Sequence, residues 1–302
     1  MATRHIIFIP GINPKPPADE HRALLWRTLL EGVRRADVAA ANNLQAHYAQ
    51  FHLVSWNQLF YHEQKDISKD MPWVEALLGK PEATAQDIRD ANAIKIKINR
   101  AALRVVDQRP FLLQLLPERS RKMALDLERY FNNTDQVASS IRDLLKQTLQ
   151  PILEKNEPVL IIGHSMGSII AYDTLWEMSQ QQALSGKVDF MTLGSPLGMH
   201  YIQHRLLGWQ SAGSGKYPSN IRKWINVAAE GDLAALNGNF SRSFKAMLDL
   251  RLLKSIEDHN HGVYNFFRNE DGLNSHRSSG YLVNPVVGRL IADWWSTPEN
   301  YN

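Results

Sequence analysis

The sequence predicts an α/β protein in which a mostly parallel, doubly wound sheet is covered by helices on both faces. Two short apolar runs, at residues 5–9 and 159–162, are bounded by turn-forming residues, as expected of strands that are buried on both sides. The second run is followed by a helical pattern over residues 168–178 and by another apolar run at 188–194. Strand, helix and strand at this spacing form the unit from which doubly wound sheets are built.

The composition suits one large globular domain. The chain has 302 residues, of which 44% are hydrophobic and 22% are charged, so it can bury a sizeable core. Its net charge of +3 is far from that of a typical nucleic-acid-binding protein, and we expect no nucleic-acid partner. We expect residues 1–302 to form a single domain that carries one insertion.

Cysteine is absent, which excludes disulfides, thiolate metal sites and a cysteine nucleophile. The apolar run near the N-terminus is too short for a signal peptide, and no stretch approaches the roughly 20 apolar residues of a membrane helix. We therefore expect a cytoplasmic protein. No pattern in the sequence indicates its oligomeric state.

The first 56 residues are expected to form a strand, a helix and a second strand. The run at residues 5–9 ends in a loop, residues 10–14, that is rich in turn formers. Alternating apolar residues over 44–54 predict the second strand, which reaches Ser55 and Trp56. Between them, an amphipathic helix over residues 19–35 is predicted by Leu24, Leu25, Leu29, Leu30 and Val33.

Residues 57–132 show no clear apolar strand and are expected to form a helical insertion, or cap. Helix-compatible segments lie at about 71–78, 84–106 and 119–131, and prolines separate them. The apolar run 111–116 has basic flanks, which suits peripheral contact with an anionic membrane or gating of an apolar substrate. Alternatively, its leucines pack onto the sheet while the cations are solvated. The basic residues are Lys95, Lys97, Arg100, Arg104, Arg109, Arg119, Arg121 and Lys122.

A helix is expected to begin at Thr134 or Asp135, with Asn133 or Thr134 as its cap, and Pro151 should bend or end it. Further strands are predicted at residues 188–194 and 221–229, and a final helix carries apolar residues from 286 to 295.

The segment 213–216, Gly-Ser-Gly-Lys, has the composition of a phosphate-binding loop but not its spacing. The first glycine of that motif would fall at Gln210, and Tyr217 stands where a magnesium-binding Ser or Thr is required. We expect a flexible surface loop here.

The segment Gly163-His164-Ser165-Met166-Gly167 places a single hydroxyl in the turn between a strand and a helix. Gly-x-Ser-x-Gly at such a junction is the nucleophile-elbow pattern, in which a strained turn lifts the serine hydroxyl off the end of the sheet. The N-terminus of the following helix directs unpaired amides toward Ser165. A plain connection between strand and helix is the alternative interpretation. Ser195, in the turn after the next strand, is expected to be a turn residue and not a second nucleophile.

The segment from Gly163 to Asp173 resembles the elbow and following helix of α/β-hydrolase-fold lipases and esterases. The run 192–198 and the C-terminal pattern from His276 to Trp295 also resemble segments of lipase-like relatives. The resemblance implies an α/β-hydrolase fold and a serine hydrolase that cleaves carboxylic esters, small-molecule or lipid, through an acyl-enzyme intermediate. It implies no cofactor. The alternatives are a catalytically silent binding or interaction protein of the same fold, and an acyltransferase.

A serine hydroxyl needs a base, and the base needs an anion to orient it. In this fold both follow the serine along the chain, the acid before the base. Asp232, in the loop after the strand at 221–229, is the expected acid, and Glu230 is the alternative. His276, in a polar loop before the final helix, is the expected base; His261 is the next candidate and His259 another. A metal site at the pair His259 and His261 lacks a third ligand, so we expect no metal.

The loop after the first strand is the expected source of one oxyanion-hole amide, because α/β-hydrolases form this hole from that loop and from the residue after the nucleophile. The matching donors are the backbone amides of Ile12 and Met166. The family more often has His-Gly where this chain has Pro10-Gly11, which leaves the amides of Gly11 and Asn13 as alternatives to that of Ile12. A simple loop between strand and helix is the other interpretation.

Overall fold

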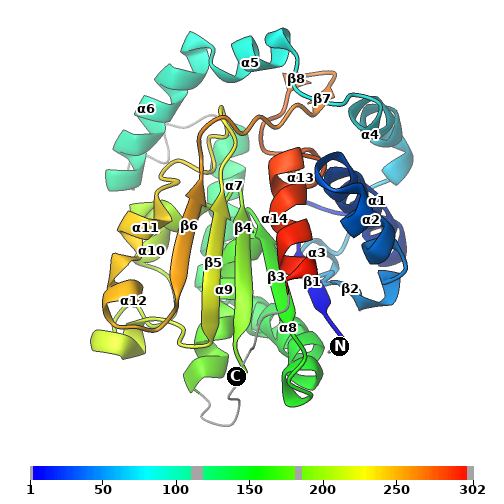
Figure 1. Cartoon of the computed structure of the whole chain (residues 1–302). Helices are drawn as coiled ribbons and strands as arrows, with labels where there is room; N and C mark the ends of the chain where they lie inside the picture. The colour runs from blue at the N-terminus through cyan, green and yellow to red at the C-terminus, as the bar shows by residue number, and fades with distance from the viewer. Residues whose placement is uncertain (1–2, 110–117, 181–185, 298–302) are drawn as a thin grey trace.

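A six-stranded, all-parallel sheet forms the centre of the computed structural model, which describes residues 3–109, 118–180 and 186–297 (Figure 1). The strand order is β2-β1-β3-β4-β5-β6, and each neighbouring pair is parallel. The α/β class expected from the buried apolar runs is thereby confirmed. The strands are β1 (His5–Ile9), β2 (Phe51–Leu53), β3 (Val159–His164), β4 (Val188–Leu193), β5 (Ile221–Val227) and β6 (Ser255–His259).

The direction of strand addition reverses between β1 and β3. From β1 the chain crosses to β2 on one side, then returns past β1 to β3 and continues through β4, β5 and β6 on the other side. Ligands of open parallel sheets bind beyond the carboxyl ends of the strands at such a reversal. Ile9 pairs with Gly163 at the ends of the two strands. The segments that leave β1 and β3 therefore emerge side by side.

Helices cover both faces of the sheet (Figure 1). Successive side chains of β1 point to opposite faces, so Ile6 and Phe8 belong to one core cluster while Ile7 and Ile9 belong to the other. One face is covered by α1 (Ala18–Ala36), α2 (Val38–Gln45), α13 (Ser278–Leu282) and α14 (Pro285–Ser296). The other is covered by α8 (Val137–Glu154), α9 (Met166–Gln180), α10 (His200–Gln203), α11 (Phe240–Ser243) and α12 (Lys245–Asp249).

The strand predicted over residues 44–54 is wrong for most of its length. The chain forms α2 up to Gln45 and a 3-10 turn at Tyr48–Gln50, and only Phe51–Leu53 pairs with β1. Asp37 caps α2 by accepting a hydrogen bond from the amide of Ala40 at 2.9 Å. The helix is also rich in alanine, and these local preferences outweigh a short alternating pattern.

The described part of the insertion, residues 57–109 and 118–132, is helical, as expected. The segment expected to be helical at 84–106 is two helices, because the chain breaks at Asn92 and Ala93. The apolar run 111–116 lies outside the described residues. In Figure 1, α5 and α6 run above the carboxyl ends of the strands. The helices are α3 (Asn57–Tyr61), α4 (Met71–Leu78), α5 (Ala85–Ala91), α6 (Ile94–Gln108) and α7 (Glu118–Phe131), with a 3-10 turn at Ile67–Lys69.

The helix expected from residue 134 begins at Val137, after a 3-10 turn at Thr134–Gln136. Neither expected cap occupies the N-cap position, yet Asn133 Oδ1 accepts a hydrogen bond from the amide of Ser139 at 3.0 Å, within the first turn. Pro151 does not end α8, which continues to Glu154. A proline this close to the C-terminus removes little of the helical hydrogen bonding.

The C-terminal region holds the final helix as predicted and four elements that were not predicted. These are β6, the short helix α13 and a hairpin of β7 (Arg268–Asn269) and β8 (Gly272–Leu273). β6 reads Ser-Ile-Glu-Asp-His and lies at the edge of the sheet with only Ile256 buried, so it lacks the apolar run of a central strand.

Of the helices in the described ranges, none combines the length and the apolar character needed to cross a membrane.

Candidate active site

Ser165 occupies the sharp turn between β3 and α9. Its backbone is left-handed, with φ of 53°, which is costly for a residue with a side chain. The surroundings hold it there, because its amide donates to the carbonyl oxygen of Leu193 at 3.0 Å and its own carbonyl accepts from the amide of Ser168 at 3.0 Å. The serine hydroxyl is thereby fixed at the carboxyl end of β3.

The two glycines of the elbow are required by close packing. A Cβ atom on Gly163 would lie 2.6 Å from Cα of Ser168, and one on Gly167 would lie 2.1 Å from the carbonyl oxygen of Ile9. Both distances are far too short for carbon side chains. Gly163 therefore lets the turn close, and Gly167 lets α9 begin directly against the end of β1.

The structure brings Ser165, His276 and Asp232 together. Nε2 of His276 lies 2.8 Å from Oγ of Ser165, and Nδ1 lies 2.8 Å from Oδ2 of Asp232. Within the described ranges, His276 is the one histidine that contacts the Ser165 hydroxyl, and Asp232 is the one carboxylate that contacts His276. Glu230, His259 and His261 are not brought to this point. His259 is the last residue of β6, where its ring approaches Glu257 at 4.0 Å.

The carboxylate of Asp232 is buried and accepts hydrogen bonds from three groups of the protein, of which His276 is one. Oδ2 also accepts a hydrogen bond from the hydroxyl of Tyr281 at 2.6 Å, and Oδ1 accepts from the amide of Ala234 at 2.9 Å. Burial alone would raise the pKa of Asp232, but the positive form of His276 and these hydrogen bonds outweigh it and hold the pKa below its ordinary value. Asp232 is therefore an anion at neutral pH.

Tyr281, in α13, supports Asp232 and was not identified from the sequence. Its hydroxyl accepts a hydrogen bond from the amide of Ala229 at 2.9 Å while it donates to Asp232. Burial and the charge of Asp232 raise the pKa of Tyr281 well above its ordinary value, so the hydroxyl keeps its proton. The only signal in the sequence was a tyrosine five residues after the candidate base.

His164, the residue before the serine, positions the backbone of His276. Its Nε2 donates to the carbonyl oxygen of His276 at 2.8 Å, and the two rings lie 4.8 Å apart. Burial and the neighbouring ring of His276 lower the pKa of His164 well below its ordinary value, so it is neutral. The sequence showed a polar residue inside the elbow, but not its partner 112 residues away.

The loop after β1 is anchored by the start of the insertion. The Trp56 indole donates to the carbonyl of Pro10 at 2.8 Å, and the Asn57 amide donates to those of Gly11 and Asn13 at 2.9 Å each. A Cβ atom on Gly11 would lie 2.8 Å from Cβ of Ser165, so this loop touches the elbow.

In the described structure, unpaired backbone amides lie in the loop after β1 and in the turn after β3. The amide of Asn13 donates to the hydroxyl of Tyr61 at 3.0 Å, which leaves Gly11 and Ile12 as candidate donors from the loop after β1. Among the described residues, the amides of Gly11, Ile12 and Met166 meet no hydrogen-bond acceptor. Unpaired amides next to a fixed hydroxyl are the arrangement that can receive an anionic oxygen.

A group of cations lies beside the same loop. Lys15 donates to the carbonyl oxygen of Ile12 at 2.6 Å, and Lys65 and Arg277 both pair with Asp70. Burial, together with the charges of Arg277 and Lys65, lowers the pKa of Lys15 to about 7. Two cations, Lys65 and Arg277, thus share one carboxylate beside Lys15, and their field favours negative charge near the loop.

The insertion also contacts the segment that carries the acid. Arg100 of α6 donates to the carbonyl oxygen of Asp232 at 3.1 Å. A Cβ atom on Gly231 would lie 2.8 Å from the carbonyl oxygen of Ala91, at the end of α5. The insertion therefore borders the candidate site at both the loop after β1 and the loop after β5.

The candidate site is defined by its geometry, without support from related proteins. Comparisons with models of protein families, with curated proteins and with solved structures returned no match. In the part of the chain that the structure describes, no group of three His, Asp or Glu side chains is arranged to hold a metal ion. The arrangement supplies a hydroxyl, an imidazole, a buried carboxylate and unpaired amides at the reversal point of a parallel sheet.

Proposed function

We propose that this protein is a serine hydrolase of the α/β-hydrolase type that cleaves carboxylic esters. The observation that carries the proposal is the hydrogen-bonded series from Ser165 Oγ through both nitrogens of His276 to Asp232 Oδ2, with 2.8 Å at each step. Such a series activates a serine by giving its proton a base whose tautomer is fixed. The chain order Ser, Asp, His is that of α/β-hydrolases.

In the first half of the proposed reaction, Oγ of Ser165 attacks the ester carbonyl carbon while Nε2 of His276 takes the hydroxyl proton. Asp232 keeps the Nδ1 proton of His276 in place and stabilises the imidazolium. The amides of Ile12 and Met166 donate to the carbonyl oxygen as it becomes negative, and the cations around Lys15 favour the same charge. His276 then returns the proton to the departing alcohol oxygen, which leaves an acyl ester on Ser165.

In the second half, a water molecule attacks the acyl ester and gives a proton to Nε2 of His276. The tetrahedral intermediate collapses, Oγ of Ser165 takes the proton back, and the carboxylic acid leaves. An alcohol in place of water would make the same enzyme an acyltransferase. No step needs a metal or a cofactor.

The exposed face of α6 favours lipid or acyl esters as substrates. Ile94, Ile98 and Val105 are 75%, 62% and 54% exposed, and Lys95 and Lys97 lie on the same helix. Apolar side chains in water beside basic ones suit peripheral contact with an anionic lipid surface. Because α6 also contacts the loop of Asp232, such contact would place the candidate site close to lipid.

The test is covalent labelling with a fluorophosphonate, which reacts with activated serines. We expect the wild type to be labelled and Ser165→Ala to remain unlabelled. Ser195→Ala is the matched control, because the Ser195 hydroxyl bonds to that of Ser168 at 2.7 Å inside a turn and should not react. A folded wild type that stays unlabelled would refute the nucleophile. If that unlabelled protein also fails to turn over p-nitrophenyl butanoate, in water or with added glycerol, it is a catalytically silent binding protein.

A further inference from the structure

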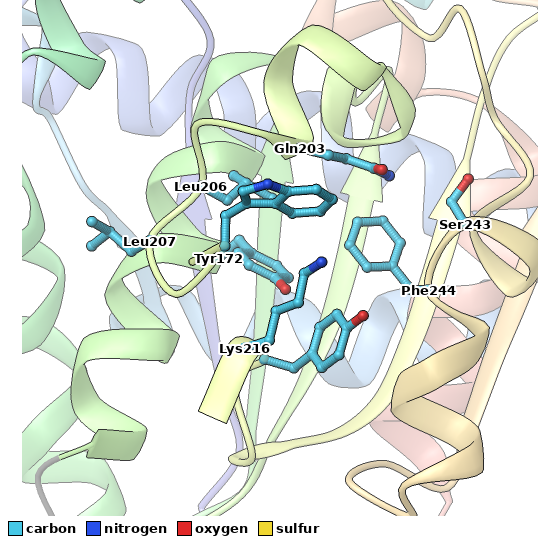
Figure 2. Close-up of a pocket in the computed structure, with 9 residues that line it drawn as sticks. Tyr172, Gln203, Leu206, Leu207, Lys216, Ser243 and Phe244 are labelled. Carbon is cyan, nitrogen blue, oxygen red and sulfur yellow. The ribbon is translucent and has the colours of Figure 1, made fainter. Parts of the chain in front are cut away.

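A cavity of about 240 Å³ lies between α9, α10 and the pair α11 and α12, and the proposed reaction does not use it (Figure 2). Neither Ser165, Asp232 nor His276 lines this cavity. Its volume is somewhat below the roughly 300 Å³ at the lower end of ordinary ligand sites, so a ligand would be small.

The walls of the cavity are aromatic and held in place. Tyr172, Trp209, Tyr217 and Phe244 line it. Trp209 stacks on the ring of His204 with 4.4 Å between centres, and the rings of Tyr172 and Phe244 are 5.8 Å apart. Rigid aromatic walls offer an apolar body a large contact area at low entropic cost.

The loop that carries Trp209 and Tyr217 is anchored to α9 by two hydrogen bonds. The amide of Leu207 donates to Asp173 at 2.9 Å, and the indole of Trp176 donates to the carbonyl of Gly215 at 2.9 Å. A ligand would therefore enter a cavity that already has its shape, and binding would not require the loop to be ordered first.

Two of the polar groups that line the cavity, the Lys216 ammonium and the Tyr172 hydroxyl, make no hydrogen bond to the described residues. The ammonium of Lys216 lies 3.2 Å from the centre of the Trp209 ring, and no carboxylate in the described ranges pairs with it. The side chain of Tyr172 is 2% exposed, and its hydroxyl has no hydrogen-bond partner among the described residues. Figure 2 shows the Lys216 ammonium and the Tyr172 hydroxyl pointing into the same space. Both groups reach the open space of the cavity with their hydrogen-bonding capacity unused among the described residues, so both can bind a ligand there.

We propose that this cavity binds a small amphipathic carboxylate, a carboxylate group carried on an aryl or short hydrocarbon body. The carboxylate would accept hydrogen bonds from Lys216 and Tyr172, and the apolar body would pack on the rings of Tyr217 and Phe244. A neutral ligand would leave the ammonium unpaired, and a cation would be repelled by it. Lys216 closes the segment 213–216, so this glycine-rich turn supplies an anion-binding lysine without being a phosphate loop.

Benzoate titrated into the whole protein and followed by isothermal titration calorimetry tests the proposal. We expect one saturable site, and we expect benzamide, a neutral molecule of similar size, to bind at least about tenfold more weakly. Lys216→Met should weaken benzoate binding by about tenfold or more and Tyr172→Phe by about threefold, with near-ultraviolet circular dichroism as the check of folding. Lys155→Met, at an exposed position after α8, is the matched control and should leave the affinity unchanged.

Several outcomes would overturn the proposal. These are the absence of saturable benzoate binding, equal binding of benzamide, or unchanged affinity in folded Lys216→Met. Benzoate should also bind equally well to protein whose Ser165 carries a phosphonate; loss of binding there would place benzoate at the candidate active site. The Lys216 and Tyr172 variants decide the matter even if Ser165 proves unreactive, because the cavity does not depend on the hydrolase proposal.

Discussion

Replacement of Asp232 by asparagine removes the charge that orients His276 while the side chain keeps its size. In the native site, Oδ2 accepts from His276 and Tyr281, and Oδ1 accepts from the amide of Ala234. The asparagine side chain has one oxygen that accepts and one nitrogen that donates, so it can accept hydrogen bonds at only one of the two positions. If the side-chain nitrogen points toward Ala234, it faces the Ala234 amide, so two buried donors oppose each other.

With its nitrogen toward His276, asparagine forces Nδ1 of the ring to accept, and the ring proton moves to Nε2. Nε2 then cannot take the proton of Ser165. We expect Asp232→Asn to lower kcat/KM for p-nitrophenyl butanoate by about 10³ to 10⁴, or about 4 to 5.5 kcal/mol in the barrier. The rate of fluorophosphonate labelling should fall in parallel, since both reactions need the same activated hydroxyl.

Glu230→Gln is the matched control for this experiment. It removes a negative charge from the same loop, two residues away, but Glu230 makes no contact with His276 in the described structure. We expect kcat/KM to stay within about twofold of the wild type. If folded Asp232→Asn kept more than a tenth of the activity, or if Glu230→Gln lost as much, the assignment of the acid would be wrong.

Two further predictions concern stability and membrane contact. Burial raises the pKa of Asp173 to about 7, so the native state retains a proton that the unfolded chain releases near pH 4, and this contribution to stability is lost as pH rises between those values. In urea titrations from pH 4 to 8, the wild type should therefore lose stability relative to Asp173→Asn; a constant difference would contradict the raised pKa. Ile98→Ser should reduce co-sedimentation with phosphatidylserine vesicles severalfold, whereas Val38→Ser, equally exposed on α2, should not, and equal binding by both variants would exclude α6 as the contact.

The position of the elbow could be predicted because most of its constraints are local; only the contact of Gly167 with Ile9 of β1 joins distant parts of the chain. The buried strand, the turn and the start of α9 follow one another in the chain, and the glycines are explained by contacts of the turn itself and of β1. The location of Asp232 followed from a rule about parallel sheets, in which all carboxyl ends share one edge. The alternating apolar pattern at residues 44–50 was short, and it predicted a strand where the chain forms the end of a helix and a 3-10 turn.

The choice of His276 over His259 and His261 depends on the path of the chain after β6. His259 remains in the edge strand, whereas the hairpin of β7 and β8 and the following turn carry residue 276 back over the end of β3. The sequence of this region contains no apolar run that would reveal such a path. The same limit applies to His164 and Tyr281, whose hydrogen bonds join segments 112 and 49 residues apart.

The two glycines at the junction of β1 and β3 explain why the candidate site lies there and not at another strand end. Gly167 allows the start of α9 to touch the carbonyl of Ile9, and Gly11 allows the loop after β1 to touch Cβ of Ser165. A side chain at either position would separate the two strand ends by the width of at least one methyl group. Gly167 therefore matters more for the packing of α9 against β1 than for the turn itself. This packing holds the loop after β1, which carries the unpaired amide of Ile12, against the serine.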